Sequence, residues 1–247
     1  MYKIKKPDSK KLEKFFINLK LERFVKLSKN YKKNLFTPFS KTLLKPNLSD
    51  LYFIYNLIIK KKRITSLEFG CGFSSEIIAL ALDENKKKYK KNIKLLRRSH
   101  AFKNFVVDNE KKYLNILRKR SNYKKNIVFN YSKCFMDLYN NNYVIRYDKL
   151  PLVSPDFIYI DGPNPKNILN RSVKMNIKDK DLMPITCDIL IIEYYLIPGT
   201  IVLIDGRGAN AQYLLDNFKR KWKYKYFRAF NMHYFELISE PLGEINI

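Results

Sequence analysis

The stretch ITSLEFGCGFSSEIIALAL, from Ile64 to Leu82, decides the fold that this sequence predicts. An apolar run passes through Glu68, reaches the two close glycines Gly70 and Gly72, and restarts with apolar residues at helical spacing. This order indicates a buried strand, a tight loop and a helix. Glycines at such a turn let the backbone approach a small polar ligand closely. We therefore expect a ligand-binding loop here.

Strands and helices alternate along the rest of the chain. Strands are expected at residues 63–69, 102–110, 126–131, 155–163 and 199–206, and helices at 74–89, 110–120, 181–196 and 209–222. This alternation predicts an α/β fold, a Rossmann-like doubly wound, mostly parallel sheet with helices on both faces. Residues 224–230 and 233–239 are expected to form a closing antiparallel pair. We interpret residues 143–148 as a further strand, half of an inserted hairpin.

The N-terminal region predicts a basic helical segment ahead of this fold. Apolar residues recur at helical spacing from Ser9 to about Lys33, with lysines on the other face. A helix of this type can lie on a membrane surface, but it more often packs on its own domain. Asn47 or Ser49 is expected to cap a following helix. We divide the chain into this segment, residues 1–48, and a Rossmann-like domain, residues 49–247.

Acidic residues stand where four of the predicted strands end. They are Glu68 beside the two glycines, Asp108, Asp161 and Asp205. One such residue by itself is usually a turn former or a helix cap. Because ligands of open α/β sheets bind beyond the carboxyl ends of the strands, the whole set predicts one ligand site along that edge.

The chemistry of the first loop separates two classes of ligand. In the dinucleotide-binding pattern G-x-G-x-x-G, the third glycine position is occupied here by Ser75. The Glu68 carboxylate is poorly suited to a pyrophosphate, but it suits a ligand with a cationic amine. S-adenosylmethionine carries such an amine and a sulfonium, and it has no phosphate.

The loop EFGCGFSS resembles the acidic-x-Gly-x-Gly loop of class I S-adenosylmethionine-dependent methyltransferases, with Ser74 in place of a third glycine. The resemblance extends from about Leu67 to Phe218. It implies that the loop, including Ser75, binds S-adenosylmethionine and that Asp108 binds the ribose hydroxyls, because one carboxylate can accept from both. It also implies that Asp161, in the segment FIYIDGP, faces both cofactor and acceptor.

The same resemblance points to small-molecule O-methyltransferases. The segment DGPN departs from the pattern of amino-methylating DNA enzymes, and no Pro-Cys pair supplies the nucleophile for cytosine C5 methylation. We expect Asp161 or Asp205 to be the base for an acceptor hydroxyl, and Arg207 to hold an anionic acceptor. Some of these enzymes hold a divalent cation at the matching strand ends. A metal is not favoured, since Gly206 and Arg207 stand where metal-binding members carry asparagine.

The net charge of +26 has two interpretations. A focused basic patch would indicate nucleic acid or another polyanion as a partner. The lysines are instead spread along the chain and accompany frequent Asn, Ile and Tyr, the pattern of an A/T-rich coding sequence.

The three cysteines have no metal-ligand spacing, and no signal peptide or apolar run of about 20 residues occurs. We therefore expect a cytoplasmic protein.

The leading hypothesis is methyl transfer from S-adenosylmethionine to a hydroxyl of a small molecule or glycan. Methylation of RNA or another polyanion is the alternative that the charge favours. A non-catalytic binding module with the same fold fits the departure at Gly206 and Arg207. A nicotinamide-dependent oxidoreductase is disfavoured by Glu68 and Ser75.

Overall fold

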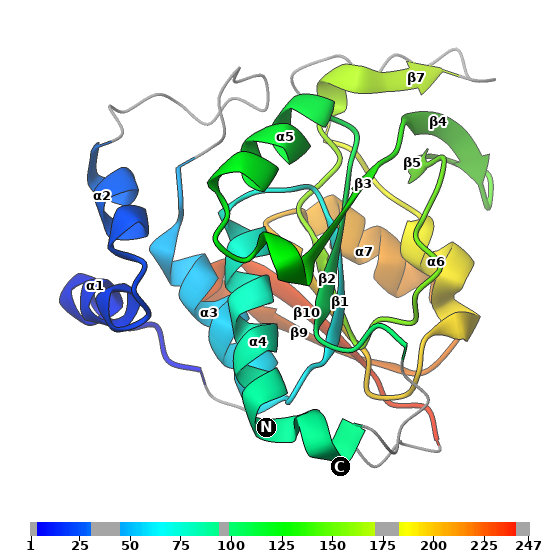
Figure 1. Ribbon diagram of the computed structural model, residues 1–247. Coiled ribbons are helices and arrows are strands. Elements are labelled where there is room, and N and C mark those ends of the chain that lie inside the picture. The colour runs from blue at the N-terminus through cyan, green and yellow to red at the C-terminus, as the bar shows by residue number, and fades with distance from the viewer. Residues whose placement is uncertain (1–3, 31–44, 94–98, 171–182, 241–247) are drawn as a thin grey trace.

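The computed structural model describes residues 4–30, 45–93, 99–170 and 183–240 of the chain (Figure 1). Its α-helices are α1 (Ser9–Asn18), α2 (Glu22–Asn30), α3 (Leu48–Lys60), α4 (Phe73–Ile93), α5 (Lys111–Arg120), α6 (Asp188–Ile192) and α7 (Gly208–Asn217). Its strands are β1 (Thr65–Phe69), β2 (Lys103–Asp108), β3 (Ile127–Tyr131), β4 (Cys134–Tyr139), β5 (Asn142–Tyr147), β6 (Phe157–Ile160), β7 (Ile168–Asn170), β8 (Ile201–Asp205), β9 (Trp222–Phe227) and β10 (Met232–Leu237). Single turns of 3-10 helix join some of these elements.

The main sheet has seven strands in the order β3-β2-β1-β6-β8-β10-β9. The five strands from β3 to β8 are parallel, and β10 pairs antiparallel with both β8 and β9. The predicted Rossmann-like sheet and its closing antiparallel pair are confirmed. The chain adds strands to one side of β1 and then, from β6 onward, to the other side. The strand order therefore reverses at β1, which is where open α/β sheets bind ligands.

Helices cover both faces of this sheet, as predicted (Figure 1). One apolar core joins one face of the sheet to α6, α7 and the small sheet described below. A second core joins the other face to α1, α2, α3 and α4. The central strands are buried along their whole length, for example every residue of β1 and β6, because each is covered from both sides.

The predicted N-terminal helical segment is confirmed and forms two helices; residues 31–33 of its apolar pattern lie outside the described residues. The chain turns between α1 and α2, where Lys20 has a φ of 58°. This turn lets both helices bury aromatic residues in the same core, Phe16 from α1 and Phe24 from α2. The boundary at residues 48 and 49 stays a prediction. Asn47 caps α3 by accepting from the Ser49 backbone N–H.

A second, three-stranded sheet has the order β5-β4-β7. The strand expected at residues 143–148 is confirmed as β5, and it forms an antiparallel hairpin with β4. The strands β4 and β7 were not predicted from the sequence. β7 has only three residues and β4 is fully buried only over its first half, so both lack the continuous apolar pattern of the central strands.

The helix predicted over residues 181–196 is confirmed only from Asp188, as α6 followed by a 3-10 turn over Glu193–Tyr195. Residues 181 and 182 lie outside the described part, and the helix α6 begins only at Asp188. Before it, the chain is held in extended form against β5, because Ile145 N–H donates to the Ile185 carbonyl and Cys187 N–H donates back to Ile145. Pro184 in this stretch also disfavours a helix.

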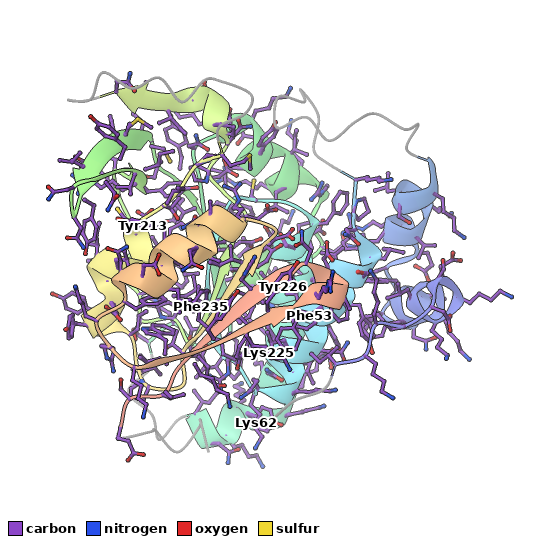
Figure 2. All side chains as sticks on the ribbon, turned by 180° about the vertical axis from the view of Figure 1, so that it is seen from behind. Phe53, Lys62, Tyr213, Lys225, Tyr226 and Phe235 are labelled. Atoms are coloured by element: carbon purple, nitrogen blue, oxygen red, sulfur yellow. The ribbon has the colours of Figure 1, made fainter. Side chains whose placement is uncertain are left out.

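The last predicted helix, 209–222, ends at Asn217 in the structure. Its expected final residues instead surround the buried Glu193, whose carboxylate accepts from the backbone N–H of Lys219 and Arg220 and from the indole of Trp222. These hydrogen bonds turn the chain from the end of α7 into β9. Figure 2 shows the β9–β10 hairpin from behind with Phe53 of α3 beside it, and the Phe53 ring lies 4.9 Å from that of Phe227.

No helix in the described ranges combines the length and the apolar composition needed to cross a membrane.

Candidate functional site

The strand register places the predicted site residues in one row along the edge of the sheet. Phe69, the last residue of β1, pairs with Val107 of β2 and with Ile160 of β6, and Ile160 pairs with Ile204 of β8. The residues that follow these four are Gly70, Asp108, Asp161 and Asp205. The expectation that the strand ends converge is therefore confirmed, and they do so on both sides of the strand where the order reverses.

Gly70 is a glycine because of packing within the protein. Its φ is +90°, and a Cβ atom there would lie 2.9 Å from the backbone nitrogen of Gly162 in the turn after β6. A Cβ on Gly162 would in turn lie 2.6 Å from the nitrogen of Gly70. The two turns touch backbone to backbone, so neither position accepts a side chain without displacement.

Gly72 is different. Its φ lies outside the left-handed region, and a Cβ there would meet only Ser74 Oγ, at an ordinary distance of 3.7 Å. Its N–H donates to Ser75 Oγ at 3.2 Å, which closes the loop onto the first turn of α4. The protein's own packing therefore does not require glycine at this position. Close approach of a ligand to the loop backbone would require it.

The Glu68 carboxylate lies inside the protein, beneath the loop, and is fully buried. One oxygen accepts from Ser74 Oγ at 2.6 Å and the other from Asn104 Nδ2 at 2.8 Å. Burial raises the pKa of Glu68 to about 7, and these hydrogen bonds oppose the rise. In this arrangement Glu68 fixes Ser74 and the start of α4. Direct binding of a cofactor amine by Glu68 stays a prediction.

Asp108 ties the end of β2 to the glycine loop. Its carboxylate accepts from Cys71 N–H at 2.8 Å and from Glu110 N–H at 2.7 Å, and the side chain is only 4% exposed. Burial raises the pKa of Asp108 to about 6, against these hydrogen bonds. The Cys71 thiol also hydrogen-bonds to this carboxylate, whose two oxygens can still accept from a ligand hydroxyl.

The loops after β2 and β6 are joined by one side chain. Asn109 donates from Nδ2 to the Asn164 carbonyl at 2.9 Å and accepts from Asn164 N–H at 3.0 Å. These two hydrogen bonds resemble those between neighbouring strands, and they hold the two loops together.

Asp161 and Asp205 form an acidic pair, which Asp50 from α3 joins. Asp161 is open to solvent on one side, whereas Asp205 is half-buried and accepts from the Tyr159 hydroxyl at 3.3 Å. The surrounding protein and the Asp205 charge raise the pKa of Asp161 to about 7, and Arg207 opposes this rise. Burial and the Asp205 charge also raise the pKa of Asp50 to about 7. A carboxyl group with such a pKa suits proton transfer near neutral pH.

Arg207 reaches from the end of β8 across to the end of β6. Its Nη2 donates to the Asp161 carbonyl at 2.8 Å. Its Nη1 is buried and has no hydrogen-bond partner among the described residues. Buried guanidinium nitrogens are normally paired, so this atom is a candidate for binding an anionic or carbonyl group of a ligand.

Within the described ranges, no three acidic, histidine or cysteine side chains are arranged to hold a metal ion.

Two residues of the site were not predicted from the sequence. Asn104 lies on β2 and donates to Glu68, and Asp50 lies on α3 near the Asp205 charge. The one available signal was the polar Asn104 next to the apolar residues of the predicted strand, and the structure buries it completely. Asp50 gave none, because a carboxylate in the first turn of a helix usually stabilises the helix end.

No protein-family model matches the sequence, and no curated protein matches it. Solved structures do match. The chain is similar to cofactor-bound Rv0187 from MTB, with 9% identity over 97% of this chain and 100% of the other, and a TM-score of 0.50. It is also similar to an SAH-bound methyltransferase of Podospora anserina, PaMTH1, at 11% identity over 97% and 100% of the chains, with a TM-score of 0.49.

A third similar structure is an O-methyltransferase from Bacillus cereus in complex with SAH, at 13% identity over 94% of this chain and 92% of the other, with a TM-score of 0.42. At these identities the likeness bears on the fold alone. At that level, the Rossmann-like α/β fold predicted from the sequence is confirmed.

Proposed function

We propose that this protein is an S-adenosylmethionine-dependent methyltransferase that acts on a hydroxyl of a small molecule or glycan. One observation carries the proposal: Gly72, in the loop at the point where the strand order reverses, has no packing reason to be glycine. The class I methyltransferase-like fold supports it, since this edge of the sheet is where ligands of such folds bind.

The residues along the edge fit S-adenosylmethionine. The backbone of the loop from Gly70 to Ser75 would lie against the cofactor, and the Asp108 carboxylate would accept from the ribose hydroxyls. No phosphate has to be accommodated beside the Glu68 and Asp108 carboxylates. When bound, the cofactor supplies a methyl group that is already activated by its sulfonium, so the protein mainly positions the acceptor.

The acceptor side is formed by Asp161, Asp205 and Arg207. We assign to the Asp161 carboxylate, with Asp205 beside it, the proton that an acceptor hydroxyl loses on methylation. The raised pKa of Asp161 makes it a stronger base than an ordinary aspartate. Arg207 would orient an anionic acceptor through its unpaired Nη1. Carboxylates are the usual ligands of divalent cations, but the positive charge of Arg207 beside Asp161 does not favour a cation here.

The test is a calorimetric titration with S-adenosylhomocysteine of the wild type, Gly72→Val and Gly208→Val. Gly208 is the matched control, because a Cβ there would also meet no close neighbour, with His233 Nε2 at 3.8 Å. We expect the wild type and the Gly208 variant to bind alike, and the Gly72 variant to bind at least about tenfold more weakly. A wild-type protein that does not bind S-adenosylhomocysteine would overturn the cofactor assignment.

We also propose that the protein is located in the cytoplasm. Cys134 and Cys187 are buried free thiols, which fits the reducing environment of a cytoplasm. If the acceptor were RNA or another polyanion, the protein would instead bind RNA with an affinity that falls steeply as the salt concentration rises.

A further inference from the structure

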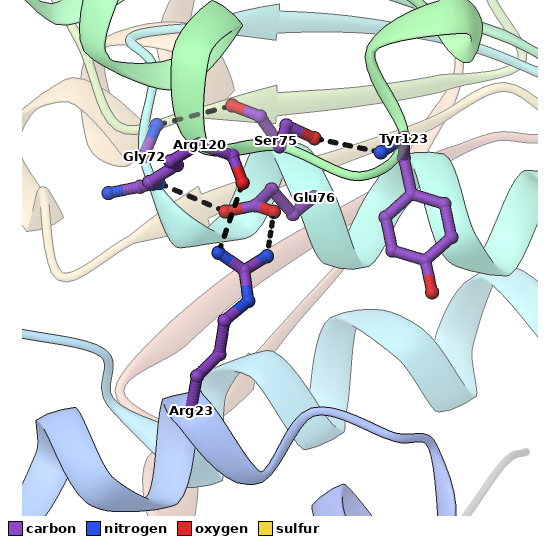
Figure 3. Close-up of polar contacts among 7 residues, drawn as sticks. Arg23, Gly72, Ser75, Glu76, Arg120 and Tyr123 are labelled. Carbon is purple, nitrogen blue, oxygen red and sulfur yellow. Dashed lines mark hydrogen bonds and ion pairs between the residues drawn. The ribbon is translucent and has the colours of Figure 1, made fainter.

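Glu76 in the first turn of α4 is a fully buried carboxylate held by two arginines (Figure 3). One oxygen accepts from Arg120 Nε at 3.0 Å, at the end of α5, and the other is paired with Nη2 of Arg23 in α2. Arg23 Nη1 also donates to the Arg120 carbonyl at 3.3 Å. Three helices that are distant in the sequence therefore meet at one carboxylate.

Removing one partner of this cluster would leave a buried charge with less compensation, which is costly. The geometry is therefore strongly determined by the three residues together. The turn after α5 is fixed as well, since Ser121 Oγ accepts from Tyr123 N–H at 3.1 Å.

Phe73 connects this cluster to the glycine loop. It directly follows Gly72 and begins α4. The Arg120 guanidinium carbon lies 3.9 Å from the centre of its ring, and Phe24 of α2 meets the ring edge-on at 5.0 Å. α2 thus holds the first turn of α4 at two points, through Phe24 on Phe73 and through Arg23 on Glu76.

The loop in turn depends on that first turn. Gly72 N–H donates to Ser75 Oγ, and Ser74 Oγ donates to Glu68, so residues 73–76 set the path of the loop backbone. We propose that Arg23 is a positioning residue for the loop, through which α2 of the N-terminal segment sets the affinity of the site for its cofactor. This inference rests on the proposed function for the identity of the ligand.

Arg23→Ala and Arg23→Lys test the inference, with Lys29→Ala as the control. Lys29 also forms an ion pair within the N-terminal segment, with Glu13 at 2.7 Å, but it does not contact α4 in the described interactions. Two quantities are measured on the full chain. They are hydrogen exchange of the peptide over residues 70–76 without ligand, and the dissociation constant for S-adenosylhomocysteine.

For Arg23→Ala we expect loop exchange to accelerate about tenfold and the dissociation constant to rise about tenfold, the usual size of a coupling through packed networks. Arg23→Lys should lie in between, because one ammonium can pair with Glu76 but cannot also reach the Arg120 carbonyl. Lys29→Ala should match the wild type. If Arg23→Ala does not fold, Arg23→Lys decides the question by the same two measurements.

Loop exchange and affinity that stay at wild-type values in the folded Arg23 variant would overturn the inference, even if the melting temperature falls. That result would make Arg23 a residue of general stability. A wild type that does not bind S-adenosylhomocysteine would overturn the proposed function alone, because the exchange measurement still decides whether Arg23 positions the loop.

Discussion

Gly70 and Gly162 lie backbone against backbone, so that a Cβ on either residue would come within 3.0 Å of the other's backbone nitrogen. This contact joins the turn after β1 to the turn after β6. Packing within the protein therefore requires glycine at position 70. It does not require glycine at position 72, which is left for a ligand.

The first prediction concerns the stability of the glycine variants. Gly70→Ala and Gly162→Ala should each lower the free energy of unfolding by about 1–3 kcal/mol, because each forces displacement of backbone, and Gly70 also has a positive φ. Gly72→Ala should change it by less than about 0.5 kcal/mol. Denaturant unfolding of the three variants measures this, and equal effects at positions 70 and 72 would contradict the assignment.

The second prediction concerns Asp108→Asn. The Asp108 carboxylate accepts from two backbone N–H groups, Cys71 and Glu110, whereas an asparagine has one oxygen and must lose one of these bonds. We expect a loss of about 1–2 kcal/mol in stability, and weaker binding of S-adenosylhomocysteine by calorimetry. Asp137→Asn, which alters an ion pair with Arg146 on the small sheet, is the control and should leave binding unchanged.

The third prediction concerns the dependence of stability on pH. Asp188 is buried, accepts from Tyr147 N–H through Oδ1 and has a second oxygen without a partner among the described residues. Burial raises its pKa from an ordinary value of 3.8 to about 7. A raised pKa favours folding below pH 3.8, and this contribution is lost as the pH rises toward 7.

Asp188→Asn removes this ionisation and keeps the oxygen that accepts from Tyr147. We expect the variant to gain stability relative to the wild type between about pH 4 and pH 7, reaching at least about 1 kcal/mol at pH 8. Denaturant unfolding at a series of pH values checks this. If the difference in stability between the two proteins does not vary with pH, Asp188 is not a buried carboxyl group with a raised pKa.

The fourth prediction concerns the acidic pair. Carbon NMR of labelled carboxyl groups should show Asp161 titrating near pH 7. Asp205→Asn should lower the pKa of Asp161, because the like charge beside it is removed, and Arg207→Ala should raise it, because a nearby positive charge is lost. An Asp161 midpoint that is unchanged in both variants would show that the three groups do not interact.

Much of the site was predictable because its signals are local in the sequence. The strand ending in Glu68, the glycine loop and the helix after it lie within 19 residues, Ile64 to Leu82, and their apolar pattern identifies each element. Acidic residues directly after buried strands could be assigned to one edge, because parallel strands end on the same side.

The errors fall where distant contacts override local pattern. The stretch before Asp188 has apolar residues at helical spacing, but hydrogen bonds to Ile145 hold it extended. The predicted helix over 209–222 stops early because Glu193, far back in the chain, binds the backbone of Lys219 and Arg220. No periodicity in the sequence contains such contacts.

By itself, the sequence determined the alternation of strands and helices, the glycine loop and the row of carboxylates, since each depends on the spacing of neighbouring residues. Only the tertiary structure decided what the individual groups do. It turned Glu68 inward to Ser74, set Gly70 against Gly162, and brought Arg23 from the N-terminal segment to Glu76. Those relationships depend on which buried surfaces meet in space, and residue spacing along one chain does not specify them.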